Sequence, residues 1–79
     1  MEIAFKFIGM TKSLVDGKAE LTLDVPENCT VEESLGILGI DCRTTKQFHF
    51  AAVNDKKSEL ERILQPGDSV KVFPRSFGG

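Results

Sequence analysis

The chain has 79 residues, of which 41% are hydrophobic and 28% charged, and its formal net charge is −2. A chain of this length forms one domain that buries only about 60–65% of the surface of its unfolded form, which leaves little room for an enclosed active site. The ten basic residues are scattered, so the clustered cations that bind nucleic acid are missing. No apolar run is long enough to span a membrane, and the first residues do not form a signal peptide. We therefore expect a cytoplasmic protein with no nucleic-acid or membrane partner.

Two segments near the start of the chain, residues 2–8 and 19–25, alternate between apolar and polar side chains. A period of two is typical of strands with one buried face, so both segments are predicted to be half-buried strands. Residues 9–18 are predicted to be the connecting loop, which contains the strong turn pair Asp16-Gly17. Pro26 closes the second strand, because proline cannot donate a hydrogen bond to a sheet ladder. Together the two segments predict an N-terminal hairpin.

A helix is predicted after the hairpin, over residues 31–38. Thr30-Val31-Glu32-Glu33 matches a capping box, in which the Thr and Glu side chains bond to each other's backbone N–H groups. Gly39 suits the position just past the helix, where the backbone turns left-handed. Apolar residues recur at the spacing of one helical face: Val31, Leu35 and Leu38. This face should pack on the sheet.

The second half of the chain contains two more predicted strands and one segment that is open to two interpretations. Residues 47–53 are apolar and aromatic nearly throughout, which predicts a central strand, and Asn54-Asp55 predicts a turn after it. Residues 58–64 fit either a short strand or a helical turn. Gln65-Pro66-Gly67-Asp68 fits a type II turn, with Pro in the second position and Gly in the third. A last alternating strand comes next and ends at Pro74.

The order of the predicted elements is strand, strand, helix, strand, a short element and strand. This is the order of the β-grasp, or ubiquitin-like, fold of the α+β class, with a mixed sheet of four to five strands and one main helix. A helix that returns to a strand makes a right-handed crossover, which places the last strand beside the first, in the middle of the sheet. We expect a β-grasp domain over residues 1–74 and a flexible C-terminal tail over residues 75–79 that ends in Gly-Gly.

Cys29 and Cys42 lie on opposite sides of the predicted helix. A helix of about eight residues is roughly 12 Å long, whereas a disulfide needs Cα atoms within about 7 Å, so two reduced thiols are expected. No metal site is expected, because two distant cysteines and the lone His49 fall short of the ligands of a zinc site. His49 is interpreted as structural or exposed. Cys42 could carry sulfur as a persulfide, but an ordinary thiol is the simpler interpretation.

The chain ends in Gly78-Gly79, and three short motifs precede this pair. They are Ala51-Ala52-Val53-Asn54, Gly67-Asp68-Ser69-Val70 and Phe73-Pro74. In this order the motifs resemble the MoaD/ThiS family of ubiquitin-like sulfur carriers, which has a central strand ending in Val-Asn, a Gly-Asp-x-Val entry to the last strand and a terminal diglycine. The likeness is at motif level over residues 51–79 and only in element order before them. The chain length and the Phe-Pro pair are closer to the MoaD branch.

The resemblance implies a carrier rather than an enzyme, at most the small subunit of a synthase complex. In such a carrier the C-terminal carboxylate, here that of Gly79, is adenylated by an E1-like enzyme with ATP and Mg²⁺ and converted to a thiocarboxylate. A synthase subunit then accepts the sulfur during cofactor biosynthesis, with the molybdopterin or tungstopterin pathway favoured and the thiazole pathway possible. The sequence also leaves a modified tRNA base or an amino acid open as the sulfur acceptor. Gly78 lets the tail pass through a narrow partner site, because glycine has no Cβ. The chain itself should bind no cofactor, since ATP and Mg²⁺ belong to the activating partner.

Four residues near the diglycine are candidates for partner binding: Phe73, Pro74, Arg75 and Phe77. Phe73 is out of phase with the valines of its strand, so it should lie on the sheet face away from the helix, either as cover for a minor core or as a docking patch. Phe77 is too near the end of the chain to belong to the core, so it should contact a partner. Arg75 is either a solvated charge or a selectivity element for the activating enzyme.

Two other functions remain open from the sequence. One is a protein modifier joined through Gly79 to lysines of its substrates, which would share the adenylation step. The other is a β-grasp binding module in which the tail is idle. A catalytic role for the chain is not indicated, because its sequence offers no nucleophile–base pair and no set of metal ligands.

Overall fold

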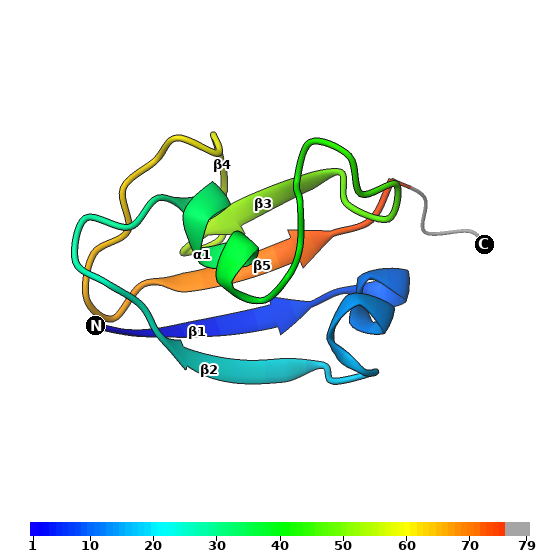
Figure 1. Ribbon diagram of the computed structural model, residues 1–79, viewed down its shortest axis with the longest axis horizontal. Coiled ribbons are helices and arrows are strands. Elements are labelled where there is room, and N and C mark those ends of the chain that lie inside the picture. Colours follow the sequence, from blue (N-terminus) through cyan, green and yellow to red (C-terminus); the bar gives the residue numbers. More distant parts are fainter. Residues whose placement is uncertain (76–79) are drawn as a thin grey trace.

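Five strands form one mixed sheet in the computed structural model, which describes residues 1–75 (Figure 1). They are β1 (Glu2–Phe7), β2 (Glu20–Asp24), β3 (Phe50–Val53), β4 (Lys56–Ser58) and β5 (Ser69–Phe73). The order across the sheet is β2-β1-β5-β3-β4, with β5 parallel to β1 and the other pairs antiparallel. The predicted mixed sheet is confirmed, and so is the place of the last strand beside the first.

The helix α1 (Val31–Ile37) lies across one face of this sheet (Figure 1). Its predicted capping box is confirmed. The Thr30 hydroxyl accepts a hydrogen bond from the Glu33 N–H at 3.1 Å, and the Glu33 carboxylate accepts one from the Thr30 N–H at 2.9 Å. Each side chain therefore satisfies a backbone N–H that the first helical turn leaves without a partner, and the helix begins where the sequence predicts.

The C-terminal end of α1 is closed by a Schellman motif. The Gly39 N–H donates to the Gly36 carbonyl at 2.9 Å, and the Ile40 N–H donates to the Leu35 carbonyl at 3.0 Å. This arrangement needs a left-handed residue just past the helix, and Gly39 supplies it with a φ of 85°. The helix ends one residue earlier than predicted because Leu38 is its cap residue.

The core lies between α1 and the sheet face that the helix covers. Val31 and Leu35 are fully buried, as their spacing predicts. Leu38 is only half-buried, because it caps the helix and lines a shallow groove with Leu21 of the edge strand β2. The sheet contributes the alternating buried residues of three strands: Ile3, Phe5, Phe7, Ala51, Val53, Val70 and Val72.

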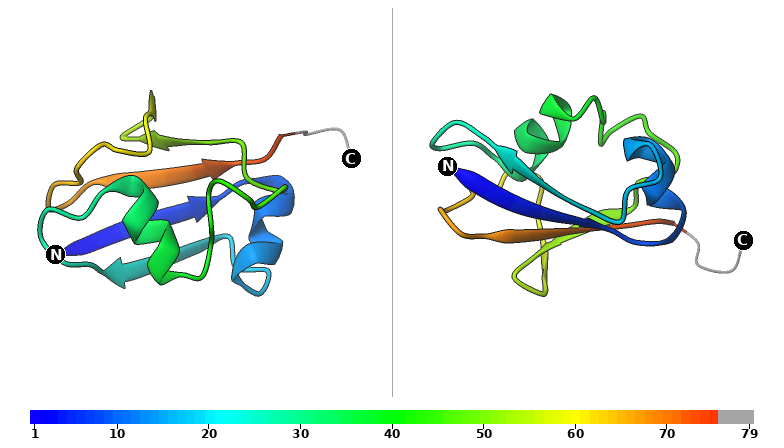
Figure 2. Two further views of the ribbon diagram at one scale, coloured as in Figure 1. Left: turned by 45° about the horizontal axis from the view of Figure 1, so that its top comes forward. Right: turned by 90° about the horizontal axis from the view of Figure 1, so that it is seen from below.

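A 3-10 helix, η1 (Gly9–Val15), occupies most of the segment predicted to be a loop. It lies on the same side of the sheet as α1 (Figure 2). Its Thr11 is fully buried. The Thr11 hydroxyl lies 2.7 Å from the carbonyl of Ile8 and 3.2 Å from the carbonyl of Val72, which is 61 positions away in the chain. The loop prediction was wrong here, because a 3-10 helix lacks the 3.6-residue apolar period and this one depends on a distant contact. Within residues 1–75, no helix is long and apolar enough to cross a membrane.

The hairpin of β3 and β4 also differs from the prediction. β3 begins at Phe50, later than predicted, because the buried Phe48 packs into the core from outside the strand. Residues 58–64, open to two interpretations, hold neither a regular strand nor a helix beyond the last residue of β4. They turn and make a single bridge from Ile63 to Thr30. Apolar composition marks such residues as buried, but it does not distinguish a buried strand from a buried loop.

Asn54 and Asp68 join the end of β3 to the start of β5. The Asn54 amide donates to one Asp68 carboxylate oxygen at 2.8 Å, and its own oxygen accepts from the Ser69 N–H at 3.0 Å. The other Asp68 oxygen accepts from the Gln65 N–H at 2.8 Å. Burial of Asp68 acts to raise its pKa, but the hydrogen bonds from Gln65 and Asn54, with the charge of Arg62, lower that pKa below 3.8. The ionised carboxylate is therefore the form that stabilises the fold.

We expect Asp68→Asn to lower the free energy of unfolding at neutral pH by about 1–3 kcal/mol, because an amide cannot accept from both donors. An aspartate whose pKa is lowered by folding adds stability above its unfolded pKa, and this stability is lost as the pH falls through the folded pKa. The difference between wild type and variant should therefore be full above about pH 5 and shrink below pH 3.8. Urea unfolding over this range measures it. Asp16→Asn, which makes the same charge change on an exposed turn, is the control, and an equal effect of both variants would contradict the prediction.

Candidate functional site

The last described residues, Phe73, Pro74 and Arg75, lie where β5 leaves the sheet (Figure 1). The other predicted site residues, Phe77 and Gly78-Gly79, lie outside the described residues. The structure therefore defines the base from which the diglycine sequence continues.

Backbone hydrogen bonds hold this end of β5 from both sides. On the β1 side, the Ile8 N–H donates to the Val72 carbonyl at 3.0 Å, and the Thr11 hydroxyl lies 3.2 Å from the same oxygen. On the β3 side, the His49 N–H donates to the Phe73 carbonyl at 2.9 Å. The strand that leads to the diglycine is thus held in place as far as Phe73.

Pro74 continues this anchoring. It is fully buried, and a Cβ placed on Gly9 would lie 3.5 Å from the Pro74 ring. Gly9 has a φ of 56°, a left-handed conformation that favours glycine, so the sharp turn from β1 into η1 brings the backbone close to Pro74. In the described structure Pro74 packs against its own chain, and its contact with a partner stays a prediction. Arg75, the next residue, is exposed.

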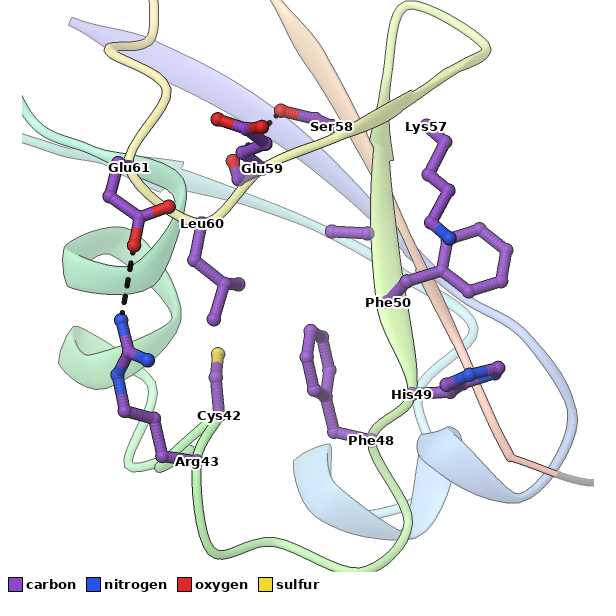
Figure 3. A pocket seen from close by; sticks show the side chains of 11 residues that line it. Cys42, Arg43, Phe48, His49, Phe50, Lys57, Ser58, Glu59, Leu60 and Glu61 are labelled. Carbon is purple, nitrogen blue, oxygen red and sulfur yellow. Dashed lines mark hydrogen bonds and ion pairs between the residues drawn. The ribbon is translucent and has the colours of Figure 1, made fainter.

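Phe73 lies on the sheet face away from α1, as its phase predicts, because Val70 and Val72 of the same strand are buried on the helix side. Its ring stacks on that of Phe50, with centroids 4.7 Å apart and planes 10° apart. We call Phe50 and Phe73 the aromatic pair. Lys57 lies over the Phe50 ring at 5.2 Å, and the exposed His49 meets that ring edge-on (Figure 3). The structure thus supports the interpretation of His49 as exposed.

An open hollow of about 580 Å³ lies between the loop after α1 and the segment after β4 (Figure 3). The Cys42 side chain points into it, and Arg43 forms an ion pair with Glu61 at 3.3 Å along one side. Burial, followed by the charges of Glu32 and Asp41, raises the pKa of the Cys42 thiol to about 11. The thiol is therefore protonated at neutral pH and a weak nucleophile, which favours the ordinary-thiol interpretation over a persulfide carrier.

Both cysteines are free, so the prediction of two reduced thiols is confirmed. Within residues 1–75, no group of three or more His, Cys, Asp and Glu side chains could hold a metal ion. The described residues instead present an anchored strand end beside a sheet face that carries aromatic and cationic side chains. Such an arrangement can display the end of the chain to a partner.

Sequence reasoning missed Thr11 and Phe50 as parts of this site. Phe50 lies in a segment that is apolar nearly throughout, so its phase could not be read before β3 was paired with β5. Thr11 stands between an exposed Met and an exposed Lys, which gives no sign of burial. Gly9, directly after an alternating strand, was the one local signal of a sharp turn.

Comparison with solved structures identifies the fold. The chain is similar to SAMP1 from Haloferax volcanii, with a TM-score of 0.78, 19% identity and full coverage of both chains. It is also similar to a putative molybdopterin converting factor, subunit 1, from Pyrococcus furiosus, with a TM-score of 0.75 and 22% identity over 94% of this chain and 97% of that one. A third match is a chain in the complex of subunits 1 and 2 of molybdopterin-converting factor from Helicobacter pylori, with a TM-score of 0.66, 22% identity and full coverage of both chains.

At these identities the likeness establishes the fold, and the chain is a β-grasp protein of the ubiquitin-like type. The predicted fold class is thus confirmed, and the resemblance to MoaD-type carriers extends to the whole domain in three dimensions. No protein-family model matches the sequence, and no curated protein matches it.

We expect Thr11→Val to loosen the end of β5, because the two side chains have similar shapes and only the hydroxyl is lost. The free energy of unfolding should fall by about 1 kcal/mol. Amide hydrogen exchange should become faster at Val72 and Phe73 and stay unchanged at the β3–β4 turn. Thr11→Ser keeps the hydroxyl and should restore the slow exchange. Thr22→Val, on the exposed face of β2, is the control, and equal exchange in all variants would show that the Thr11 hydroxyl does not hold the strand.

Proposed function

We propose that this chain is a sulfur carrier whose working group is the carboxylate of Gly79. The observation that carries the proposal is the anchored end of β5. Pro74 is packed into the domain, and five more residues follow it in the sequence, of which the last two are the diglycine. Five residues reach at most about 16 Å when extended, which is enough to enter a partner's active site while the domain docks outside it. The β-grasp fold, shared with a molybdopterin converting factor subunit, supports this interpretation.

The chemistry supplies a reason for the carrier. A carboxylate resists substitution, because attack on it would expel oxide. An oxygen of the Gly79 carboxylate therefore attacks the α-phosphate of ATP on the E1-like partner, which releases pyrophosphate and forms an acyl adenylate. The terminal sulfur of a persulfide then displaces AMP to give an acyl disulfide. A thiol cleaves the S–S bond, which leaves the thiocarboxylate on Gly79 and a new disulfide on the sulfur donor.

The thiocarboxylate is the nucleophile that the carrier delivers to a sulfur-accepting synthase subunit. We favour molybdopterin or tungstopterin biosynthesis over thiazole biosynthesis, because two of the similar structures bear the name of the molybdopterin converting factor. The chain's own contribution is recognition and delivery, while ATP and Mg²⁺ are used by the activating partner. Gly78 and Gly79 have no Cβ, so the tail can pass a narrow channel.

We expect the cognate E1-like enzyme, with ATP, Mg²⁺ and a persulfide donor, to add sulfur at Gly79. Exchange of one oxygen for sulfur adds about 16 Da, as does oxidation of one Met or Cys, so the added mass must be located by fragmentation. Deletion of Gly79 should abolish the mass change without lowering stability, because the tail lies beyond the packed Pro74. An added mass that maps to a Met or Cys, or that forms without ATP, would contradict the proposal.

We expect Phe73→Ala to weaken docking, since truncation of a buried aromatic anchor often costs more than about 2 kcal/mol of binding energy. The KM for the carrier should therefore rise, while the rate at saturating carrier should stay near that of wild type. Phe73→Leu keeps apolar area and should recover part of the loss. Met10→Ala removes an exposed apolar side chain from η1 and is the control. A fall in the saturated rate with an unchanged KM would argue against a docking role.

A protein modifier joined through Gly79 to substrate lysines is the second candidate function. A specific observation favours it, because one of the similar structures is that of small archaeal modifier protein 1 from H. volcanii. Both functions need the acyl adenylate, so loading alone does not separate them. A ladder of larger adducts in cell lysate that disappears when Gly79 is deleted identifies a modifier.

A β-grasp binding module with an idle tail is the remaining alternative. Its activity would survive deletion of Gly78-Gly79, whereas both carrier and modifier functions would be lost. The same deletion therefore separates this class from the other two.

A further inference from the structure

A row of lysines crosses the sheet face that α1 leaves uncovered. The strand register places Lys6 of β1 beside Lys71 of β5, Lys71 beside Ala52 of β3, and Ala52 beside Lys57 of β4. Residues paired across strands point to the same face. Lys6 and Lys71 are thus about 5 Å apart along the row, and Lys57 is about 10 Å further on. We call Lys6, Lys71 and Lys57 the lysine row. The aromatic pair is the next residue pair on the same face, two positions along β5 toward its exit.

This row is unfavourable for the free protein, because like charges on directly paired residues repel each other. Two exposed acids offset it in part. Asp55 forms an ion pair with Lys71, and Glu20 lies beside Lys6 at the edge of the sheet. A hydrogen bond from Lys71 and its charge, with the charge of Lys6, lower the pKa of Asp55. The row still carries one more positive than negative charge, in a chain whose net charge is −2.

The lysines gather toward one end of this face, whereas the opposite end carries only acids among the charged residues that the structure describes. At the far end of the strands, Glu2 lies beside Asp24, and both are exposed. The lysine row therefore occupies the end of the face from which the tail leaves. Beside it, a hollow of about 370 Å³ has small side chains in its lining, such as Ala4 and Ser69, together with Lys6, Lys71 and the acid Glu20. The face thus offers an aromatic ridge, a row of cations and a hollow within one continuous surface.

We infer that the lysine row and the aromatic pair form a single docking surface whose occupant is an acidic patch with an apolar centre on the E1-like adenylating enzyme. This inference rests on the proposed function and adds the partner's chemistry to it. The apolar centre of the patch packs on the aromatic pair, and its carboxylates face Lys6 and Lys71. An apolar centre surrounded by charges is the usual anatomy of a protein–protein interface.

A protein occupant fits the surface better than a nucleic acid. The two phenyl rings stack on each other, so the surfaces between them are not available to bases, which bind by stacking on aromatic rings. Three lysines are also few for a polyanion that is held mainly by phosphate contacts. They match the few carboxylates that border a protein interface.

Asp55 occupies the place of the partner's carboxylate in the free protein. It is exposed and sits on the turn between β3 and β4, where its φ is 69°. It can release Lys71 by rotation of its side chain alone. An incoming carboxylate then replaces it, so that the ion pair of the free protein is exchanged for one across the interface.

The test measures binding of the full chain to its cognate adenylating enzyme by calorimetry, without ATP, at low and high salt. Lys6→Gln combined with Lys71→Gln should weaken binding about tenfold at low salt and reduce its salt dependence. Lys18→Gln combined with Lys46→Gln makes the same charge change at exposed positions outside the row and should bind like wild type. Asp55→Asn should bind at least as tightly as wild type, because it frees Lys71. Lys57→Gln, on the exposed edge strand, is a second test that does not depend on the double variant folding.

Equal weakening by the row and control variants would overturn the inference, and so would weaker binding by Asp55→Asn or no binding of the enzyme to wild type. Tighter binding of a single-stranded oligonucleotide or of phosphatidylglycerol vesicles to the row would overturn it in favour of another occupant. Loading of Gly79, measured in the same samples after ATP is added, separates the two proposals. If Gly79 is loaded and the row variants keep the wild-type KM, the docking inference alone fails. If the enzyme binds through the row and Gly79 is not loaded, the proposed function alone fails.

Discussion

The pairing of β5 between β1 and β3 is the constraint on which the rest of this structure depends. β5 is parallel to β1 and antiparallel to β3, so its backbone is hydrogen-bonded along both edges. Its two valines are fully buried beneath the helix, and its alternate side chains, Lys71 and Phe73, are placed on the open face. A strand held in this way fixes the position of the next residues in the chain. In this protein the next residues are Pro74 and Arg75, the last that the structure describes.

The two ends of β5 are secured by different means. At its start, Asn54 and the buried Asp68 form a polar network that closes the turn before the strand. At its end, Thr11 and Ile8 contact the Val72 carbonyl. The motifs around residues 51–54 and 67–70, which carry the family resemblance, lie in the first of these networks. In the structure these motifs fix the start of β5. They therefore lie at the opposite end of the strand from Phe73, where the chain leaves the sheet.

The two ends of β5 thus separate the motifs that build the fold from the residues to which we assign the function. The motifs at residues 51–54 and 67–70 build the entry to β5, so in this structure they serve the fold. In our proposal, the function depends instead on the terminal diglycine and on the open face beside the exit of β5. That face combines the aromatic pair with a lysine row that the free protein satisfies only in part. A row of like charges that lowers the stability of the free protein can be offset by a partner, which supports a role for this face in binding.

The local sequence was sufficient to predict the elements whose signals are contained within a few residues. The Thr30–Glu33 capping box, the turn at Gly39 and the alternation of β1 are of this kind, since each depends on neighbours along the chain. The diglycine is likewise visible only as sequence. The tertiary structure alone decided which residues meet across strands. Thr11 approaches Val72, Phe50 stacks on Phe73, and Lys6 lies beside Lys71 because the register of β5 brings together residues more than 20 positions apart in the chain. Strand register is set by packing of the whole buried face, and no local pattern encodes it.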